Sequence, residues 1–415
     1  MKVLIVGGGV GGLALTLSLH DAGVTDVHIL ESASAIKEVG VGINVLPHAT
    51  RELAELGLLD DLRAVGIPTE QLSYYTEHGQ RIWTEPRGLP AGYAWPQFSI
   101  HRGDLLALLH RAVIQRLGAD RIHTDQAVTE VGQTSGGAWV TTASSPNRRE
   151  ADVVVACDGV HSVIRRTFYP NEGPPKWNGI TMWRGTTHMP TFLSGRTMIM
   201  AGVIAKRVVA YPISQRAEDH RNALVNWVAE VRTADHESMS VADWQFRATA
   251  DEPLDHFSSF VFDFLDVPKT ISGSNEIFRY PMIDRDPLPT WNFGSITLLG
   301  DAAHPMYPVG SNGASQAIID ARVLTRELVL GSSIEGALAA YDAQRRPATA
   351  AVVAANRQVG PEQSMEIVAQ RAPNGFTNLD DVITQEELHA ISAKYKLTAG
   401  FDPELLNSRP SLSVR

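Results

Sequence analysis

The sequence has very little cysteine, since Cys157 is the only one among 415 residues. A single cysteine excludes a disulfide within the chain and any metal site built from a cysteine cluster. Long apolar runs are also missing, because no stretch reaches the roughly 18 residues that a membrane-spanning helix needs. The first residues lack the basic flank, apolar stretch and cleavage site of a secretory signal. We therefore expect a soluble, cytoplasmic protein with no membrane partner.

Positive charge is scarce as well. Lys and Arg total 36 against 46 Asp and Glu, which gives a formal charge of −10. This balance argues against nucleic acid as the main partner, because binding to phosphates needs a basic surface. The chain is long enough for two or three structural units at roughly 150 residues each. Composition alone does not indicate an activity.

The N-terminal residues carry a recognisable pattern. Residues 2–6 are rich in β-formers and predict a buried strand, and the helical composition of residues 13–19 predicts a helix. Between them, Gly7, Gly9 and Gly12 occupy the G-x-G-x-x-G positions. One glycine makes the tight turn, one lets backbone approach a pyrophosphate, and one lets the helix pack against the strand. The free N–H groups at the start of the helix would face the phosphates.

A second predicted strand at residues 27–30 ends in Glu31, 19 residues after Gly12. A carboxylate at this point can accept hydrogen bonds from the ribose hydroxyls of an adenosine. The alternative is a glycine-rich turn and an exposed Glu31 with no ligand. The strand, turn, helix and acid together favour a dinucleotide site, and Glu31 argues against a 2′-phosphate there.

Two later strands also end in glycine and aspartate. Residues 152–157 lead into Asp158-Gly159, and residues 295–299 lead into Gly300-Asp301. Ligands lie at the carboxyl ends of parallel strands, so we expect these turns to meet the first one. Asp301 would accept hydrogen bonds from a ribityl hydroxyl, although either aspartate could simply cap a helix. The turn at residues 310–313 would present N–H groups to an electron-rich ring edge.

These three motifs together resemble the single-component (group A) FAD-dependent aromatic hydroxylases, the p-hydroxybenzoate hydroxylase-like superfamily. The resemblance implies that Glu31 holds the adenosine ribose and that Asp301 holds the ribityl region. It also implies that Arg102 lies near FAD and that residues 41–43 lie along the isoalloxazine ring. The cofactor-binding residues so implied are Gly7, Gly9, Val10, Gly11, Gly12, Glu31, Ser32, Val41, Gly42, Ile43, Arg102, Val128, Asp158, Gly159, Asp301, Pro308, Gly310, Asn312 and Gly313.

The resemblance also implies an α/β fold. A Rossmann-like FAD-binding domain would hold an inserted, mainly antiparallel substrate sheet and be followed by C-terminal helices. We assign residues 1–70, 98–180 and 276–360 to the discontinuous FAD-binding domain, and residues 71–97 and 181–275 to the substrate domain. Residues 361–415 would form a helical segment whose last residues, 400–415, are a loose tail.

Within this superfamily the chain looks like the phenazine-hydroxylating branch, which hydroxylates a methylated phenazine carboxylate with loss of the carboxyl group. The segments that carry this likeness are 40–44, 99–103, 179–185, 280–282 and 306–316. The match is looser around residues 200–207 and 230–266, where substrate specificity would lie. A hydroxylase of another aromatic acid or N-heterocycle, salicylate-like or nicotinate-like, stays open, as does an FAD-dependent oxidase or dehydrogenase.

The implied chemistry depends on the flavin. NADH or NADPH would bind transiently and reduce FAD, since no second dinucleotide motif is present. Oxygen would add as a flavin C4a-hydroperoxide and pass one atom to a small aromatic substrate. The protein would position the flavin and exclude water from it. A homodimer is plausible for the superfamily, but no pattern in this sequence indicates one.

No side-chain cluster indicates an acid–base or metal-based catalytic site, so catalytic residues stay unassigned. We expect Tyr211 to orient the substrate and Arg207, on the same strand face, to attract a carboxylate. Trp183 and Trp227 could sandwich a flat ring or simply fill the core. Met306 and Pro308 are expected to line the pocket by their position in the late motif. Arg207 could instead be a solvated surface charge, and Tyr211 an ordinary core residue.

Overall fold

The computed structural model describes residues 1–36, 40–219, 222–233 and 246–414. Its first sheet has six strands in the order β21 (Asn292–Phe293), β22 (Ile296–Leu298), β12 (Val153–Ala156), β1 (Lys2–Val6), β2 (Asp26–Leu30) and β8 (Ile122–His123). All neighbouring pairs are parallel except β21 with β22. The strands predicted at residues 2–6, 27–30, 152–157 and 295–299 are therefore confirmed to within about one residue at each end.

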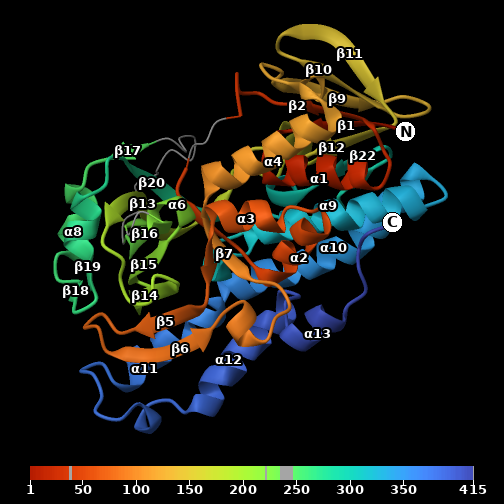
Figure 1. The fold of residues 1–415 in the computed structure, drawn as a ribbon. Helices are drawn as coiled ribbons and strands as arrows, with labels where there is room; N and C mark the ends of the chain where they lie inside the picture. Colours follow the sequence, from red (N-terminus) through yellow and green to blue (C-terminus); the bar gives the residue numbers. More distant parts are fainter. Residues whose placement is uncertain (37–39, 220–221, 234–245, 415) are drawn as a thin grey trace.

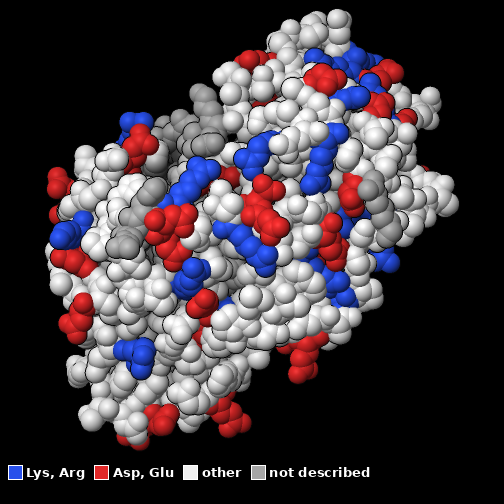
Figure 2. All heavy atoms as spheres, in the orientation of Figure 1, with Lys and Arg blue, Asp and Glu red and all other residues white. Residues whose placement is uncertain are grey.

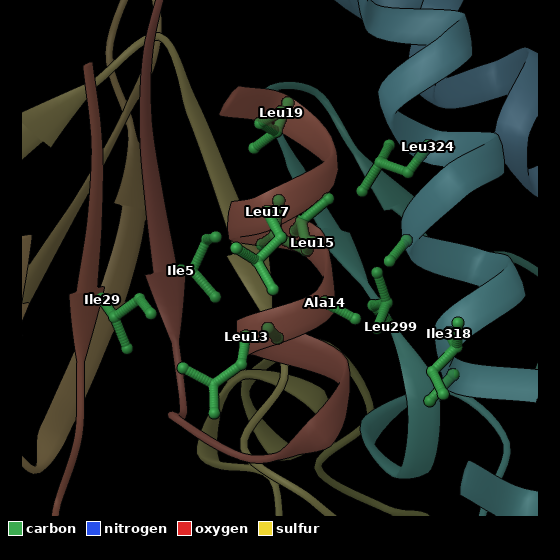
Figure 3. Packing of buried hydrophobic residues seen from close by; sticks show 14 of the residues in the cluster. Ile5, Leu13, Ala14, Leu15, Leu17, Leu19, Ile29, Leu299, Ile318 and Leu324 are labelled. Atoms are coloured by element: carbon green, nitrogen blue, oxygen red, sulfur yellow. The ribbon is translucent and has the colours of Figure 1, made fainter. Parts of the chain in front are cut away.

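Four helices cover this sheet or stack on one another beside it: α1 (Val10–Asp21), α4 (Arg102–Leu117), α9 (Gly313–Leu330) and α10 (Ile334–Arg357). Figure 3 shows α1 lying between the sheet and α9, with Leu13 and Leu17 on the strand side and Ala14 facing α9. Because α1 is enclosed on both sides, eight of its residues in succession, 12–19, are buried. An apolar helix of this kind belongs inside a layered domain, not on its surface.

A second sheet forms the other half of the molecule (Figure 1). Its eight strands follow the order β17 (Arg247–Ala248), β20 (Ile277–Asp284), β13 (Lys176–Met189), β16 (Ala223–Arg232), β15 (Lys206–Pro212), β14 (Thr197–Val203), β5 (Gln71–Tyr75) and β6 (Arg81–Pro86). Among the strand pairs of this sheet that the structure describes, only β14 and β5 are parallel. The expected α/β fold with a mainly antiparallel second sheet is therefore confirmed.

The division into domains stays a prediction, and sheet membership affects two of its boundaries: β13 already begins at Lys176, inside the segment predicted to end at residue 180, and β20 lies inside the segment predicted to begin at residue 276. β20 pairs with β13 over most of its length, so it belongs to the second sheet. The predicted FAD-binding segment begins at residue 276 and would include β20. The pairing therefore moves this boundary to the end of β20, at Asp284.

The second sheet has two apolar faces, because alternate side chains of a strand point to opposite sides. Tyr211 and Val209 of β15 belong to a cluster with Met198 and Met200 of β14. Val208 and Ala210 of β15 belong to the opposite cluster, with residues of helices α7 (Asp251–Phe257) and α8 (Val267–Ser272). We call the first the inner face, because it packs against the C-terminal helices and the loop at residues 307–309.

Three smaller sheets complete the strand arrangement, one of them the antiparallel pair β18 (Val261–Phe262) and β19 (Leu265–Asp266). β3 (Gly42–Val45), β7 (Gln97–His101) and β4 (Ile67–Thr69) form an antiparallel sheet, as do β9 (Val128–Gln133), β10 (Ala138–Thr142) and β11 (Ser145–Ala151). The β9–β11 sheet stands at the end of the molecule far from the second large sheet (Figure 1). Helices α2 (Pro47–Glu55) and α3 (Leu59–Val65) follow β3.

The C-terminal segment contains helices α11 (Gln363–Arg371), α12 (Gln385–Thr398) and α13 (Pro403–Ser408). The prediction of a loose tail from residue 400 is wrong for most of its length. Arg51 donates hydrogen bonds to the carbonyl oxygens of Leu406 at 2.9 Å and Arg409 at 2.8 Å, and Arg409 pairs with buried Glu52. The tail is ordered because it supplies partners to charges that α2 buries.

Charges of both signs alternate over the face drawn in Figure 2. Within the described ranges, no helix combines the length and hydropathy needed to cross a bilayer.

Replacing Arg409 with Ala should destabilise the protein by about 1–3 kcal/mol, because it leaves the buried Glu52 carboxylate short of one donor. Urea unfolding at neutral pH measures the effect. Arg63→Ala is the matched control, since its pair with Asp60 is largely exposed and should contribute at most about 1 kcal/mol. An equal fall in the free energy of unfolding in the two variants would show that the tail contact stabilises the protein no more than an exposed ion pair does.

Candidate active site

The strands of the first sheet end in one row. Leu30 pairs with Val6, Val6 with Ala156, and Ala156 with Leu298. The residues that follow are therefore held side by side at the carboxyl edge of the sheet, where open α/β sheets bind ligands. Glu31, the Gly7 turn, Asp158 and Asp301 all leave from this edge.

The glycines of the first turn have different surroundings. A Cβ on Gly12 would collide with the carbonyl oxygen of Gly7, so Gly12 is required for α1 to pack against β1. Gly9 has an ordinary extended backbone, and a Cβ there would meet no atom within 4 Å. Contacts within the chain therefore do not explain Gly9, whereas a phosphate approaching the backbone would.

The start of α1 suits an anion. No side chain caps this helix and its first turn contains no acidic residue. The first N–H groups of a helix have no partner within the helix and carry partial positive charge. With the open space at Gly9, this end of α1 fits the pyrophosphate of FAD.

Glu31 is placed beside the same turn. Its carboxylate accepts hydrogen bonds from the backbone N–H groups of Gly8 at 2.7 Å and Ala33 at 2.8 Å, and from the Ser32 hydroxyl at 3.1 Å. The first two bonds fix the carboxylate next to the glycine turn. A carboxylate has about four acceptor positions, so one is left for a ribose hydroxyl.

Asp158 binds the start of a helix with one oxygen only, while Ser162 is the residue that caps this helix. Oδ2 accepts a hydrogen bond from the N–H of Val163 at 2.8 Å, at the start of α5 (Val163–Phe168). Oδ1 is buried and has no partner in the structure. A buried acceptor without a donor is unfavourable, so this oxygen fits a ligand hydroxyl or N–H group.

Asp301 lies at the end of the row and is exposed. Its side chain does not cap the short helix at residues 300–302, so the alternative of a simple helix cap does not hold. A Cβ on Gly313 would lie 3.9 Å from both Asp301 Oδ1 and Met306 Cγ. The structure therefore brings these three predicted residues together.

The segment predicted to lie along the flavin ring is held by three strands of the second large sheet. The carbonyl oxygen of Gly42 accepts hydrogen bonds from Arg184 Nη2 at 2.8 Å and from the Tyr211 hydroxyl at 3.1 Å, while the Gly42 N–H donates to Asn226 Oδ1 at 2.7 Å. Arg102 donates its backbone N–H to the Val41 carbonyl oxygen. Burial raises the pKa of Tyr211, so its hydroxyl keeps the proton that it donates. The hydroxyl thus binds the backbone here, and Tyr211 holds the ring-side segment.

A buried polar network supports the late loop at residues 308–313. His304 Nε2 lies 2.5 Å from Asp320 Oδ2, and Arg345 Nε donates to Asp320 Oδ1 at 2.7 Å. Arg345 also binds Gln316, whose amide donates to Asn312 Oδ1 at 3.1 Å. Burial alone would raise the pKa of Asp320, but attraction to His304 and Arg345 lowers it to about 2. The ionised carboxylate therefore anchors the helix that follows the loop.

A narrow cavity of about 20 Å³, room for about one water molecule, lies beside this loop and reaches Gly310 and Ser311. Met198 and Met200 contribute to it from the inner face of the second sheet, and Tyr395 from α12. Its charged lining residues are Arg87 and Lys396. Neither was predicted, because no short motif surrounds them and only the fold brings the end of β6 next to α12.

Arg207 does not have its predicted role. It lies on the inner face with Tyr211, but its guanidinium is 2% exposed and pairs with the carboxylates of Glu230 and Glu362. The alternative of a solvated surface charge is wrong as well. Two carboxylates from the chain already neutralise Arg207, so it is not available to a substrate carboxylate.

Trp183 and Trp227 lie on the opposite face of the second sheet from Tyr211. The Trp183 indole donates to Glu252 at 3.0 Å and the Trp227 indole to Ser274 at 2.7 Å. The interpretation that they sandwich a substrate is therefore wrong, because strand alternation directs them into the outer core.

Three further predicted residues, Val128, Pro308 and Met306, make no side-chain hydrogen bond within the described ranges, and burial alone characterises their placement. Val128 is buried at the start of β9 in the core of the first sheet. Pro308 is exposed at the start of the late loop, and Met306 is partly buried against the cluster that contains Tyr395 and Phe401. In the described ranges no group of three or more His, Cys, Asp or Glu side chains could hold a metal ion.

Gly9→Ala should leave folding unchanged but weaken FAD binding. The added methyl meets no protein atom but fills the space assigned to pyrophosphate, and overpacking of about 1–3 kcal/mol corresponds to a roughly 5- to 150-fold rise in Kd. Fluorescence titration of the flavin-free protein with FAD measures this. Gly12→Ala is the comparison, since it should lower the melting temperature of the flavin-free protein. Unchanged FAD affinity in Gly9→Ala would place the pyrophosphate elsewhere.

His48 should make stability sensitive to acid. It is fully buried, and burial together with the charges of Arg345 and Arg409 lowers its pKa to about 3. Between pH 6.5 and 3 the His48 imidazole binds a proton in the unfolded chain but not in the folded protein. The free energy of unfolding therefore falls as the pH falls. At pH 5 this amounts to about 2 kcal/mol. Urea unfolding of His48→Gln should show a flatter pH dependence than the wild type or His78→Gln, whose side chain is exposed. An unchanged slope would contradict the assignment.

Comparison with known proteins agrees with this site. The pattern of the FAD binding domain family matches residues 1–250 and 273–356. The chain is 45% identical over 361 residues to phenazine 1,6-dicarboxylic acid hydroxylase PhzS of Lysobacter antibioticus, covering 86% of this chain and 89% of the relative. It is 29% identical to 3-amino-4-hydroxybenzoate 2-monooxygenase PtmB3 of Streptomyces platensis, covering 87% and 88%.

A solved structure shows the same fold. Klebsiella pneumoniae HpxO, complexed with FAD and uric acid, superposes with a TM-score of 0.77 at 21% identity, covering 99% of this chain and 97% of HpxO. The predicted FAD cofactor and the predicted aromatic monooxygenase class are confirmed by these matches. The glycine turn, the free oxygen of Asp158 and the match over most of the sequence lead to one conclusion: the chain belongs to the FAD binding domain family, among its aromatic-ring hydroxylases.

Proposed function

We propose that this monooxygenase hydroxylates a phenazine carboxylate. The observation that carries the proposal is the 45% identity to a phenazine 1,6-dicarboxylic acid hydroxylase over most of both chains. If the ring carbon that bears the carboxyl group is the one hydroxylated, we propose that the carboxyl group is lost in the same reaction.

The residues of the chain would bind, orient and shield. FAD, when bound and reduced by NADH or NADPH, supplies the activation of O2 that amino-acid side chains cannot provide. Gly9 and α1 would hold its pyrophosphate, Glu31 its adenosine ribose, and Asp301 its ribityl chain. Tyr211, Arg184 and Asn226 would fix Gly42 beside the ring, and the inner face of the second sheet would exclude water from it.

A second candidate substrate is a smaller aromatic acid. It is favoured by the relative that acts on 3-amino-4-hydroxybenzoate, although that relative is less similar at 29% identity. The narrow cavity admits neither substrate unless flexible side chains such as Met198 and Met200 move aside, and one ring needs less movement than three. The same assay distinguishes the two substrates.

We also propose a cytoplasmic location, supported by the dependence on NAD(P)H and by the single cysteine. A homodimer stays a prediction.

The test is oxidation of NADH and of NADPH by the purified FAD-loaded protein, with phenazine-1-carboxylate, its N-methyl derivative or 3-amino-4-hydroxybenzoate. Hydrogen peroxide and product mass are measured in the same reaction. Fast oxidation with a hydroxylated phenazine and little peroxide is the expected result. Hydroxylation of the benzoate alone would contradict the phenazine assignment, and no response to any aromatic compound would contradict the function.

A further inference from the structure

The cavity beside Gly310 has one apolar wall and one polar wall, and it would admit a flat molecule once the flexible side chains of Met198 and Met200 move aside. Leu72, Met198 and Met200 from the inner face and Phe401 from the chain end provide apolar contact. Gln97, Ser392 and Lys396 bring polar groups to it, together with Arg87. Pockets for small molecules combine mainly apolar walls with a few placed polar groups in this way.

The cavity also touches the loop that we assign to the flavin ring. Gly310 and Ser311 belong both to its lining and to the late motif. Asn44, one residue beyond the ring-side segment 41–43, donates to the Ser311 hydroxyl at 3.3 Å. A molecule in this cavity would therefore lie next to the proposed flavin position. The inference below rests on the proposed function in this respect.

Arg87 is buried but incompletely paired. It is 9% exposed, and Nη2 lies 2.7 Å from Glu85 Oε2. Its Nε is buried and has no hydrogen-bond partner. A guanidinium has five N–H donors in a fixed fork, and a carboxylate fills that fork best. Arg87 is therefore a buried cation with one carboxylate partner and with an N–H group that lacks an acceptor.

Lys396 shares the same counter-ion. Its Nζ lies 2.7 Å from Glu85 Oε1, and the Ser392 hydroxyl also donates to Glu85. Although burial opposes ionisation, attraction to Arg87 and Lys396 lowers the pKa of Glu85, so it stays a carboxylate. Two cations thus face one anion, and this trio carries a net charge of about +1 at neutral pH.

The nearby ion pairs of Arg207 do not neutralise the positive charge of Arg87 and Lys396. Glu230 and Glu362 are bound to Arg207, and none of these three lines the cavity. Burial also raises the pKa of Glu362, which reduces its negative charge. The positive charge of Arg87 and Lys396 therefore faces the cavity itself, where a buried charge is favourable only if it is paired.

We propose that Arg87 and Lys396 bind a carboxylate of the aromatic substrate and so set the preference for aromatic acids over neutral rings. The carboxylate would accept hydrogen bonds from the Arg87 guanidinium and the Lys396 ammonium, while Met198, Met200 and Leu72 contact the ring. This assigns the carboxylate-binding role expected of Arg207 to two residues that the fold brings together from β6 and α12.

The experiment compares the binding of an acid with that of its neutral analogue. Dissociation constants of phenazine-1-carboxylate and phenazine-1-carboxamide are measured by the change in flavin absorbance of the FAD-loaded wild type, Arg87→Met, Lys396→Met and Arg87→Lys. A charge-assisted hydrogen bond corresponds to a roughly 10- to 100-fold change in Kd. We expect this loss for the acid in Arg87→Met and Lys396→Met, with less than about 3-fold change for the amide. Arg87→Lys should fall between, since it keeps the charge but loses the fork.

Lys394→Met is the matched control, since it removes the same charge from an exposed position two residues away on α12. It should bind both ligands as the wild type does. FAD content and melting temperature are checked for every variant, and Lys396→Met and Arg87→Lys decide the question if Arg87→Met does not fold. Equal losses for acid and amide would overturn the proposal by showing a structural role only, and so would unchanged binding of the acid.

Failure of this inference can be told from failure of the proposed function. If wild-type protein hydroxylates phenazine-1-carboxylate and the variants bind it normally, only the role of Arg87 and Lys396 is wrong. If wild-type protein hydroxylates no phenazine acid, the proposed substrate is wrong, and the same comparison with a benzoate and its amide tests the cation pair directly.

Discussion

The register of the first sheet is the constraint on which the site depends. Pairing aligns Leu30, Val6, Ala156 and Leu298 across four strands that come from three distant parts of the sequence. A slip of one residue in a strand would turn its side chains to the other face and displace the turn that follows. The glycine turn, Asp158 and Asp301 can contact one cofactor only because the strand ends are held in register.

A second constraint joins the two halves of the protein at Gly42. Its carbonyl oxygen accepts hydrogen bonds from two strands of the second sheet, its N–H donates to a third, and a Cβ would collide with Asn226 and Ile213. The ring-side segment is therefore fixed against the second sheet. This arrangement lets the second sheet cover the proposed ring position, with its inner face providing the walls that keep water away.

Much of the cofactor side could be predicted from the sequence because its signals are local. Each buried strand, its glycine turn and the helix after it lie within about 20 consecutive residues. Each such segment predicts a ligand at the carboxyl end of its strand. The substrate side could not be predicted so well, because it depends on which distant groups the fold brings together. Arg207 and Tyr211 do share a face, but Glu362 comes from beyond the sheet to neutralise Arg207.

The residues that were missed have the same explanation. Arg87 lies at the end of a short edge strand and Lys396 on a helix near the chain end, and neither position has a local signature. The tail was wrongly predicted to be loose because its contacts are with charges buried in α2, which composition does not reveal. Long-range ion pairs thus decide the parts of the structure that short motifs leave open.

The most direct measurement is a crystal structure of the protein with FAD and phenazine-1-carboxylate, grown without oxygen or reductant. The account predicts the pyrophosphate at Gly9 and the start of α1, the ring beside Gly42 and the loop at residues 310–313, and the carboxylate of the ligand on Arg87 and Lys396. FAD bound away from the row of strand ends, or a ligand whose carboxylate points away from this pair, would contradict it.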